Sequence, residues 1–524
     1  MVGRAAPRVA TRTSYLANNL ESINDCSQSY PTHLRNMSPA REESDPTVDQ
    51  PALPPRALGL SLLEIYYTRL YNASLLFCKP ILFQEYLDGK LPGFFLKALF
   101  ALATLFLSLP RGDDNAGPIE HSELKVLSAY ASCGLPWAKS SQREMMSLIF
   151  EEPSLTIIQS LHSLQMYWFG IGKPQSGNLC LALAHRSCQL LGYNKKIING
   201  VEKSDVSLES ELKRRCFWAC WVSTCVLMEP EPFIRSAWQD VAMLPLPAHI
   251  SSTPSGYEVI INEKMDQTWC SNLLEPRNED NRFPTDAASF VKMVGIWAKA
   301  QLLVRDSPSP TAQTLDSMQR LSHMAKSIFE TATAGRDQAN HVNEASSENK
   351  PMLLFFHALY HISQITLHSM IIPLFSGTHI EPTVEPDTVK ANAEVVTHHA
   401  EMFEQLLAPY LYGKGDVTQL APFVGYGAFI IGIVFLATEV SCQDKSSRVT
   451  VSEMHRDTRR LSSVKAILHL LDTLRVYWKA LDHCVMGKAS CRLAGIFINP
   501  SKPVQIRRCI KQSINNARHT DFGS

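Results

Sequence analysis

The stretch that decides the fold runs SLTIIQSLHSLQMYWFG (154–170), GNLCLALAHRSCQLLG (177–192) and ESELKRRCFWACWVSTCVLM (209–228), and DVAMLPLP (240–247) follows it. Gly170 ends the first segment, and the loop-like fourth segment contains two prolines. Glycine and proline interrupt helical patterns. The stretch therefore predicts three helices and a loop, and the rest of the chain is expected to add helices around them.

Apolar residues in the first two segments recur at a spacing of three and four, which places them on one face of a helix. In the first segment this set is Leu155, Ile158, Leu161, Leu164 and Trp168. In the second segment the predicted stripe is Leu179, Ala182, Leu183 and Leu190. Gly192 stands where a left-handed C-terminal cap would end that helix.

The third segment differs because it is apolar nearly all round. Glu209 and Glu211 open it, and acidic residues suit the positive end of a helix. After Lys213, Arg214 and Arg215 it carries no charge as far as residue 228. A helix without a polar face is buried in a large core.

In order and spacing these segments resemble the regulatory domain of fungal zinc-cluster transcription factors, called the middle homology region. That family shows G-x-A-x-R-x-A-x-x-L-G, then E-x-x-R-R-x-F-W-x-x-Y-x-x-D, then G-R-P and D-I-x-x-x-L-P. The matching residues here are Ala184, Arg186, Leu191, Gly192, Glu211, Arg214, Arg215, Phe217, Trp218, Asp240 and Pro245.

Four positions depart from the family pattern. Ala182 stands in place of Gly, Trp221 in place of Tyr, and Thr224 in place of Asp, while Pro-Glu-Pro at 230–232 replaces G-R-P. The resemblance still implies the fold. A function that depends on the G-R-P loop is not carried over.

The resemblance implies an all-α fold, with one large multi-helix regulatory domain over residues 58–500. A disordered N-terminal segment and linker (1–57) would precede it, and a basic tail (501–524) would follow. The implied function is regulation of transcription in a fungal nucleus, directed at a metabolic gene set such as one for secondary metabolism.

The same resemblance implies partners. The domain is expected to contact DNA directly or through a partner transcription factor, to receive a small apolar effector or a partner between its helices, and to form homo- or heterodimers. Arg214 and Arg215 are expected to pair with acids inside the domain and so fix helix packing, because a guanidinium binds a carboxylate through two hydrogen bonds.

The DNA-binding module of that family requires six cysteines, in two C-x2-C-x6-C groups that share two zinc ions. Residues 1–77 contain one cysteine, Cys26. No metal or cofactor is therefore expected here, and zinc only if a cysteine cluster precedes this sequence. One interpretation is a regulator with such a cluster upstream. The other is a co-regulator that does not bind DNA and works by heterodimerising with an intact factor.

Composition limits the class of protein. Of the 524 residues, 45% are hydrophobic and 19% are charged, which is typical of a globular chain. Fifty basic and fifty acidic residues give a formal net charge of zero, so the whole chain has no general attraction to nucleic acid. Many of the 13 cysteines lie in apolar segments and are predicted to be buried, reduced thiols: Cys180, Cys188, Cys216, Cys220 and Cys225.

Outside this stretch, hydrophobic periodicity and polar runs predict further elements. Helices are expected at 58–71, 93–109, 121–137, 286–306, 314–333, 351–373 and 462–488. Loops are expected at 251–256, 275–284, 336–350 and 444–460.

Two segments allow a functional alternative. His357, His361 and His368 fall on one helical face and could share a metal ion, but core histidines are the preferred interpretation, as for His398 and His399. Residues 417–438 contain no charged residue and are long enough to cross a bilayer. No cluster of Lys or Arg flanks them, so a central buried helix is preferred and no membrane contact is expected.

No enzyme signature is present. The sequence has no G-x-S-x-G, no H-E-x-x-H, no phosphate loop and no dinucleotide fingerprint. Asp113 and Asp114 are the only adjacent aspartates, and no second metal motif accompanies them. We therefore predict no catalytic residues. An all-helical enzyme or a membrane-associated biosynthetic protein is the alternative from another class.

Overall fold

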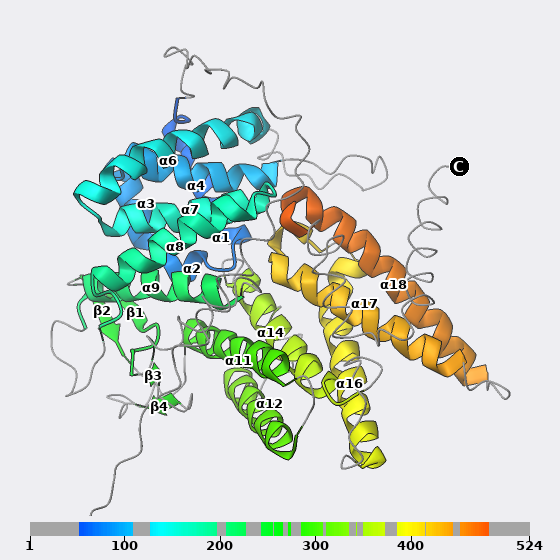
Figure 1. Cartoon of the computed structure of the whole chain (residues 1–524). Helices are drawn as coiled ribbons and strands as arrows, with labels where there is room; N and C mark the ends of the chain where they lie inside the picture. Colours follow the sequence, from blue (N-terminus) through cyan, green and yellow to red (C-terminus); the bar gives the residue numbers. More distant parts are fainter. Residues whose placement is uncertain are drawn as a thin grey trace, which may run out of the picture. The chain divides into compact units, whose positions relative to one another are not determined.

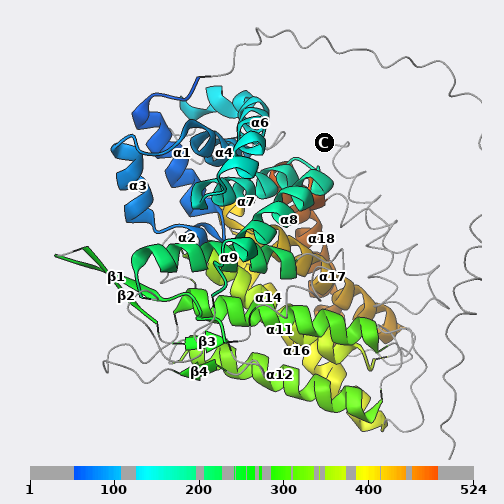
Figure 2. The same ribbon diagram turned by 60° about the vertical axis from the view of Figure 1, so that its left-hand side comes forward.

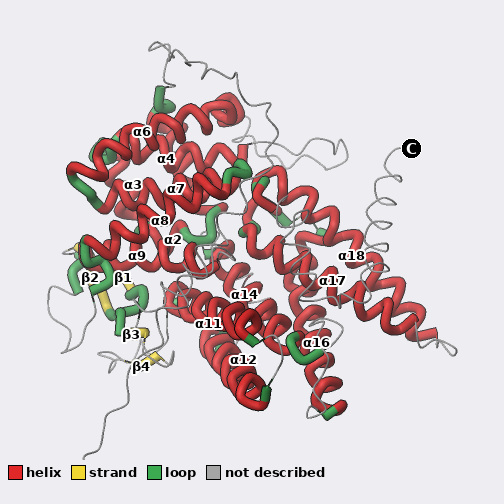
Figure 3. Tube along the Cα trace, viewed as in Figure 1, coloured by secondary structure: helices red, strands yellow, loops and turns green. Residues whose placement is uncertain are grey.

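A computed structural model provides the three-dimensional structure of the chain. The residues it describes are 52–107, 126–195, 206–226, 241, 243–254, 256–261, 263–265, 271–273, 285–307, 311–334, 342, 349–372, 385–413, 415–443 and 451–481. Fourteen α-helices account for most of them, which confirms the all-α fold (Figure 3).

The first half of the described chain is helical throughout. Its α-helices are α1 (Arg56–Arg69), α2 (Ala73–Leu76), α3 (Lys79–Leu87), α4 (Gly93–Thr104), α6 (Gly134–Glu151), α7 (Leu155–Gly170), α8 (Pro174–Leu190) and α9 (Leu208–Val226). Short 3-10 helices occupy Leu105–Leu107 and Ser128–Cys133. Helices α7, α8 and α9 are the three helices predicted from residues 154–228.

Two small antiparallel hairpins separate the halves, formed by β1 (His249–Thr253) with β2 (Gly256–Ile260) and by β3 (Glu263–Met265) with β4 (Ser271–Leu273). The remaining elements are α11 (Asp286–Asp306), α12 (Ala312–Ala332), α14 (Lys350–Ser369), α16 (Pro386–Leu411), η6 (Val417–Gln419), α17 (Pro422–Gln443) and α18 (Val451–Tyr477). Thr285 and Thr311 cap α11 and α12, because each side-chain oxygen accepts a backbone N–H of the first turn.

The helices pack in two groups that α9 and α11 join. In the first group α7 packs on α4 and α8, and α4 packs on α1 and α6; in the second, α14 packs on α11, α12, α16 and α17, and α18 covers α17 (Figure 1). Helix α9 lies beside α11, and α2 lies against α9 (Figure 2). The charge-free part of α9 from Cys216 to Cys225 is buried, as the sequence predicted.

The predicted apolar stripe of α8 is wrong. Leu179 is 69% exposed and Leu190 is 71% exposed, while the buried residues of α8 are Leu181 and five small ones: Gly177, Cys180, Ala184, Ser187 and Cys188. A Cβ on Gly177 would lie 2.9 Å from the backbone oxygen of Gln165 in α7. At Gly177 the two helices approach too closely for a side chain between them, so a small residue is needed there.

Three other expectations need correction. Residues 251–256 are not a simple loop, because β1 and β2 pair across them. Helix α18 begins at Val451, inside the segment expected to be a charged loop. The helix predicted over 121–137 is a 3-10 turn at Ser128–Cys133 that runs into α6. The loop expected at 275–284 and the tail at 501–524 lie outside the described residues.

The cysteines behave as predicted. Cys180, Cys188, Cys216, Cys220 and Cys225 are all buried free thiols. None of the seven cysteines whose side chains the structure describes forms a disulfide.

In the part of the chain that the structure describes, two helices are long and apolar enough to cross a membrane by length and composition. They are Asp286–Asp306 and Pro422–Glu439, and 78% and 83% of their apolar windows are buried inside the protein. The second is the segment for which a bilayer span was the alternative. Both helices pack on neighbours in the core, as the preferred interpretation predicted.

The core histidines lie between α14 and α16. His357 and His361 are buried, and Nδ1 of His361 lies 3.0 Å from Nδ1 of His399, so one ring donates a proton to the other. His368 contacts Asn392 and lies 3.0 Å from the hydroxyl of Ser322. Burial lowers the pKa of His361 well below its usual range, and the nearby His399, His357 and His398 lower it further. Burial lowers the pKa of His399 to about 3.

We expect these histidines to make the protein acid-sensitive. In the unfolded chain they bind a proton below pH ~6.5, whereas in the folded protein they stay neutral, so the free energy of unfolding falls as the pH drops below that value. The expected loss is roughly 1.4 kcal/mol per pH unit for each such histidine, and it ends near the lower folded-state pKa. Urea unfolding between pH 7 and pH 4 measures it.

The histidine pair can be tested against a matched surface histidine. His399→Gln should reduce the pH slope, while His469→Gln, on the exposed side of α18, should leave it unchanged. Equal slopes in the wild type and in His399→Gln would contradict the assignment.

Candidate functional site

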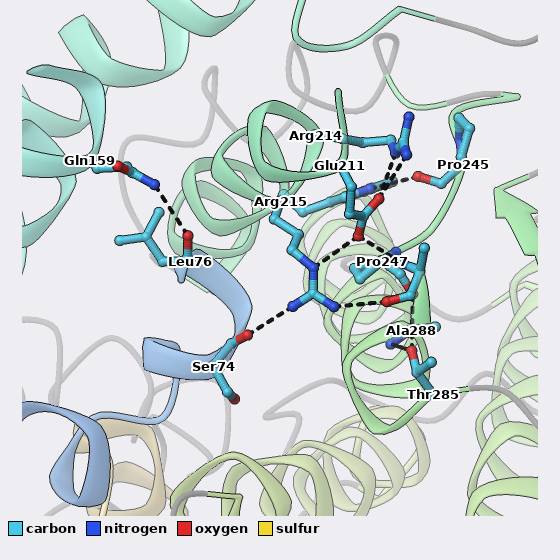
Figure 4. Close-up of polar contacts among 12 residues, drawn as sticks. Ser74, Leu76, Gln159, Glu211, Arg214, Arg215, Pro245, Pro247, Thr285 and Ala288 are labelled. Carbon is cyan, nitrogen blue, oxygen red and sulfur yellow. Dashed lines mark hydrogen bonds and ion pairs between the residues drawn. The ribbon is translucent and has the colours of Figure 1, made fainter. Parts of the chain in front are cut away.

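A buried carboxylate at the start of α9 organises the region that carries the E-x-x-R-R-x-F-W pattern. Glu211 is fully buried and accepts four hydrogen bonds (Figure 4). Its Oε2 accepts Nε of Arg214 at 3.1 Å and Nη2 of Arg214 at 2.7 Å. Its Oε1 accepts Nε of Arg215 at 2.8 Å and the backbone N–H of Ala248 at 2.8 Å. Both oxygens are therefore saturated.

Arg215 extends this network to other parts of the chain. Its Nη1 donates to the carbonyl of Ser74 in α2 at 2.9 Å, and its Nη2 donates to the carbonyl of Ala248 at 2.8 Å. Figure 4 shows the guanidinium between Glu211 and the carbonyl of Ser74. The planar fork of arginine suits such a junction, because its donors point in fixed directions. Arg215 thus ties α9 both to α2 and to the segment before β1.

The 245–248 segment is held at further points. Nε1 of Trp218 donates to the carbonyl of Pro245 at 2.8 Å. The hydroxyl of Thr285 donates to the carbonyl of Pro247 at 3.0 Å and accepts the N–H of Ala288 at the start of α11. The segment therefore connects α9 to α11 through backbone oxygens.

A second buried ion pair supports the same region. Nζ of Lys292 in α11 lies 2.9 Å from Oε2 of Glu263 in β3, and both side chains are almost wholly buried. Removing one member of such a pair leaves an uncompensated charge in the core. The arrangement is rigid and saturated. It can hold helices in one orientation, and it presents no nucleophile or acid–base pair for chemistry.

Comparison with known proteins identifies the family. The fungal specific transcription factor domain matches residues 63–359, more than half of the chain. The chain belongs to this family of fungal transcription factors. The match begins in α1 and ends inside α14, so it contains the whole Glu211 network. Proteins of this family are transcription factors, a class that generally lacks enzymatic activity.

Curated relatives agree with this family. Two Zn(2)-C6 fungal-type transcription factors of Fusarium oxysporum f. sp. lycopersici, FTF1a and FTF2, are each 26% identical over 208 residues, which is 37% of this chain and 18% of the relative. Another relative from that fungus, FTF1c, is 26% identical over 180 residues, or 33% of this chain. The matched part of the chain thus spans about a fifth of the length of these factors.

The structure brings only some of the family-pattern residues together. Glu211, Arg214, Arg215 and Trp218 meet in the network, and Phe217 packs beside Trp218 with ring centroids 5.8 Å apart. Arg214 and Arg215 both pair with Glu211, an acid inside the domain, as the sequence analysis predicted.

The other family-pattern residues lie apart from the network. Arg186 is exposed on α8, where it donates to Gln189 at 3.0 Å. Gly192 follows α8 with φ of +69°, the left-handed cap expected there. Asp240 lies outside the described residues.

Sequence reasoning missed the hydrogen-bond and ion-pair partners of the residues in the Glu211 network and of Lys292. The acceptors at Ser74, Pro245 and Ala248 are backbone carbonyls, which every residue carries, so no sequence signal could have found them. Lys292 did carry a signal, because it is a charged residue between Val291 and Met293, whereas Glu263 lies between Asn262 and Lys264 and carried none. Their pairing depends on the hairpin β3–β4, and no strand was predicted there.

Proposed function

We propose that this regulator controls a metabolic gene set, such as one for secondary metabolism, through its helical domain in the fungal nucleus. The observation that carries the proposal is the family match over residues 63–359. The resemblance adds the metabolic targets, because genes for such factors often accompany metabolic pathways.

The proposed mechanism uses the helical domain as a scaffold with a defined orientation of α9. Glu211 and Arg215 join α9 to α2 and to the 245–248 segment, and Thr285 joins that segment to α11. A small apolar effector or a protein partner that binds between these helices would act on elements already coupled by hydrogen bonds. The domain could then change as a unit between an inactive and an active form.

We further propose that the protein reaches DNA either directly or through a partner transcription factor in a homo- or heterodimer. With 50 basic and 50 acidic residues, the chain has no net charge to attract the phosphate backbone. Selective binding would therefore need a dedicated module or a partner. If zinc takes part, the six-cysteine module of the family would hold it.

Chromatin immunoprecipitation of the tagged protein, with RNA sequencing of a deletion strain, tests the function. We expect enrichment at promoters of a limited set of metabolic genes, whose transcripts change in the deletion strain. A strain with an unchanged transcriptome under inducing conditions, together with no promoter enrichment, would contradict the proposal.

Salt titration of DNA binding separates direct from indirect action. The purified 524-residue chain is titrated against the enriched promoters and against random duplex. If a partner supplies the contact, we expect only weak binding, with Kd on the order of 10⁻⁴–10⁻⁶ M and no preference between the two DNAs. Tight binding that is selective for the promoters would instead place a DNA reader within this chain.

A further inference from the structure

Three cysteine thiols meet in the core between α8 and α9. Cys188 lies in the last turn of α8, while Cys216 and Cys220 lie one turn apart on the same face of α9. Their sulfur atoms are all within 4.8 Å of one another, and all three residues are fully buried. No disulfide joins them. Neither the family match nor the Glu211 network uses these sulfurs.

Three thiols at this separation form a donor set for a thiophilic ion. Thiolate sulfur selects soft metals and metalloids, whereas hard cations such as Mg²⁺ or Ca²⁺ take oxygen ligands. The sulfurs come from two helices, so one bound atom would also crosslink α8 to α9.

The surroundings of the thiols decide which charge the bound atom should carry. Residues 216–226 contain no charged side chain. Besides the other two thiols, the ionisable groups that influence the pKa of Cys220 are His162 and His185. Burial lowers the pKa of His162, which keeps its imidazole neutral at pH 7. Burial raises the pKa of Cys188 and Cys216, whereas hydrogen bonds from these two thiols, followed by His162 and His185, hold the pKa of Cys220 well below its usual range. The surroundings therefore favour at most one thiolate in a cluster that offers three sulfur donors, whereas a structural zinc site needs four ligands.

Charge balance then distinguishes the candidate ions. A complex of three thiolates with monovalent copper has a net charge of −2, and one with divalent zinc has a net charge of −1. A complex of three thiolates with trivalent arsenic is neutral. An isolated charge in a low-dielectric core costs several kcal/mol. The neutral complex fits this part of the core best.

His162, which lies against α9, has a buried ring nitrogen whose hydrogen-bonding capacity no described residue uses. Its side chain is fully buried, and its Nε2 lies 3.0 Å from the hydroxyl of Ser223 and 3.2 Å from the carbonyl of Ala219 on α9. Among the residues that the structure describes, its Nδ1 has no hydrogen-bond partner. Buried polar atoms are paired as a rule, and this unpaired nitrogen belongs to a ring that interacts electrostatically with Cys220.

We propose that Cys188, Cys216 and Cys220 bind one trivalent arsenic atom, supplied as arsenous acid. Three S–H groups and As(OH)₃ form three As–S bonds and release three water molecules, so that protons and charge balance and no atom changes oxidation state. Access is through the last turn of α8, because helix ends fray and Cys188 lies in that turn. This site does not depend on the proposed function.

The test is arsenite binding by the purified full chain in a phosphine reductant. After desalting, arsenic per chain is measured by mass spectrometry, and X-ray absorption reports the neighbours of the arsenic. In the wild type we expect one arsenic atom with three sulfur neighbours. This arsenic should be lost in Cys188→Ala, Cys216→Ala and Cys220→Ala. Each variant should bind at least about 10–100-fold more weakly, the loss that even outer-shell changes cause at metal sites.

Cys180→Ala and Cys225→Ala are matched controls. Both cysteines are buried on the same two helices, but neither belongs to the cluster. The controls should keep the arsenic of the wild type, and circular dichroism checks that all variants remain helical. Equal arsenic in cluster variants and controls would overturn the proposal. So would stoichiometric zinc at these three sulfurs with no arsenite binding.

Discussion

Glu211→Gln should lower the free energy of unfolding by about 3–5 kcal/mol, the cost of removing one member of a buried ion pair. The carboxylate accepts four hydrogen bonds, two from Arg214, one from Arg215 and one from the N–H of Ala248. An amide keeps the shape but carries no charge, and its NH₂ group would face donors. Two buried guanidinium groups would then lose the carboxylate with which they pair.

Urea unfolding followed by circular dichroism measures this loss, and Glu209→Gln is the matched control. Glu209 lies in the same first turn of α9 but is exposed, and it pairs with Lys213 at the surface. Exposed ion pairs contribute roughly 0–1 kcal/mol. If Glu211→Gln cost no more than Glu209→Gln, the network would not be what fixes α9.

The network also predicts coupling between its members. Glu211 and Arg215 share a hydrogen bond of 2.8 Å, so the effects of Glu211→Gln and Arg215→Gln should not add. Contacting residues show interaction energies of about 0.5–3 kcal/mol in double-mutant cycles. Simple additivity in the cycle would show that the two side chains act independently.

Trp218→Ala should lower the free energy of unfolding by about 3–5 kcal/mol. The indole is fully buried, meets Phe217 and Trp221 edge-on, and donates to the carbonyl of Pro245. Alanine leaves a cavity in the core and also removes that donor. The loss should appear in the urea midpoint without a large change in the slope.

Two further variants separate packing from hydrogen bonding. Trp218→Phe keeps most of the ring but leaves the carbonyl of Pro245 without its donor, which should cost about 1–3 kcal/mol. Phe150→Ala in α6 is the control for removing an aromatic ring, because Phe150 is 78% exposed and should matter by less than about 0.5 kcal/mol. A Trp218→Phe variant as unstable as Trp218→Ala would assign the whole effect to the hydrogen bond.

Local patterns predicted most of the helices because they depend on near neighbours along the chain. The recurrence of Ile158, Leu161 and Leu164 located α7, and the charge-free run after Arg215 predicted that α9 is buried. The start of α18 was missed because its first turns are charged, and a polar helix has no apolar stripe to detect.

The error on α8 shows where periodicity fails. Leu179 and Leu190 suggested one face, but the buried residues are Leu181 and the small residues Gly177, Cys180, Ala184 and Cys188. An apolar stripe identifies the inward side only when the neighbouring helix leaves room for large side chains. Helix α7 comes too close at Gly177, so the small residues face it.

For the site, the sequence by itself determined which side chains are charged inside an apolar helix, and therefore that Arg214 and Arg215 need an acid. Only the tertiary structure decided that this acid is Glu211, that Arg215 also reaches the carbonyl of Ser74 some 141 residues away, and that Cys188 meets the cysteines of α9. The physical reason is that a charge or a hydrophobic period is a property of the residues themselves. A backbone carbonyl or a distant sulfur becomes a partner only when the packing of whole helices brings it within a few ångströms.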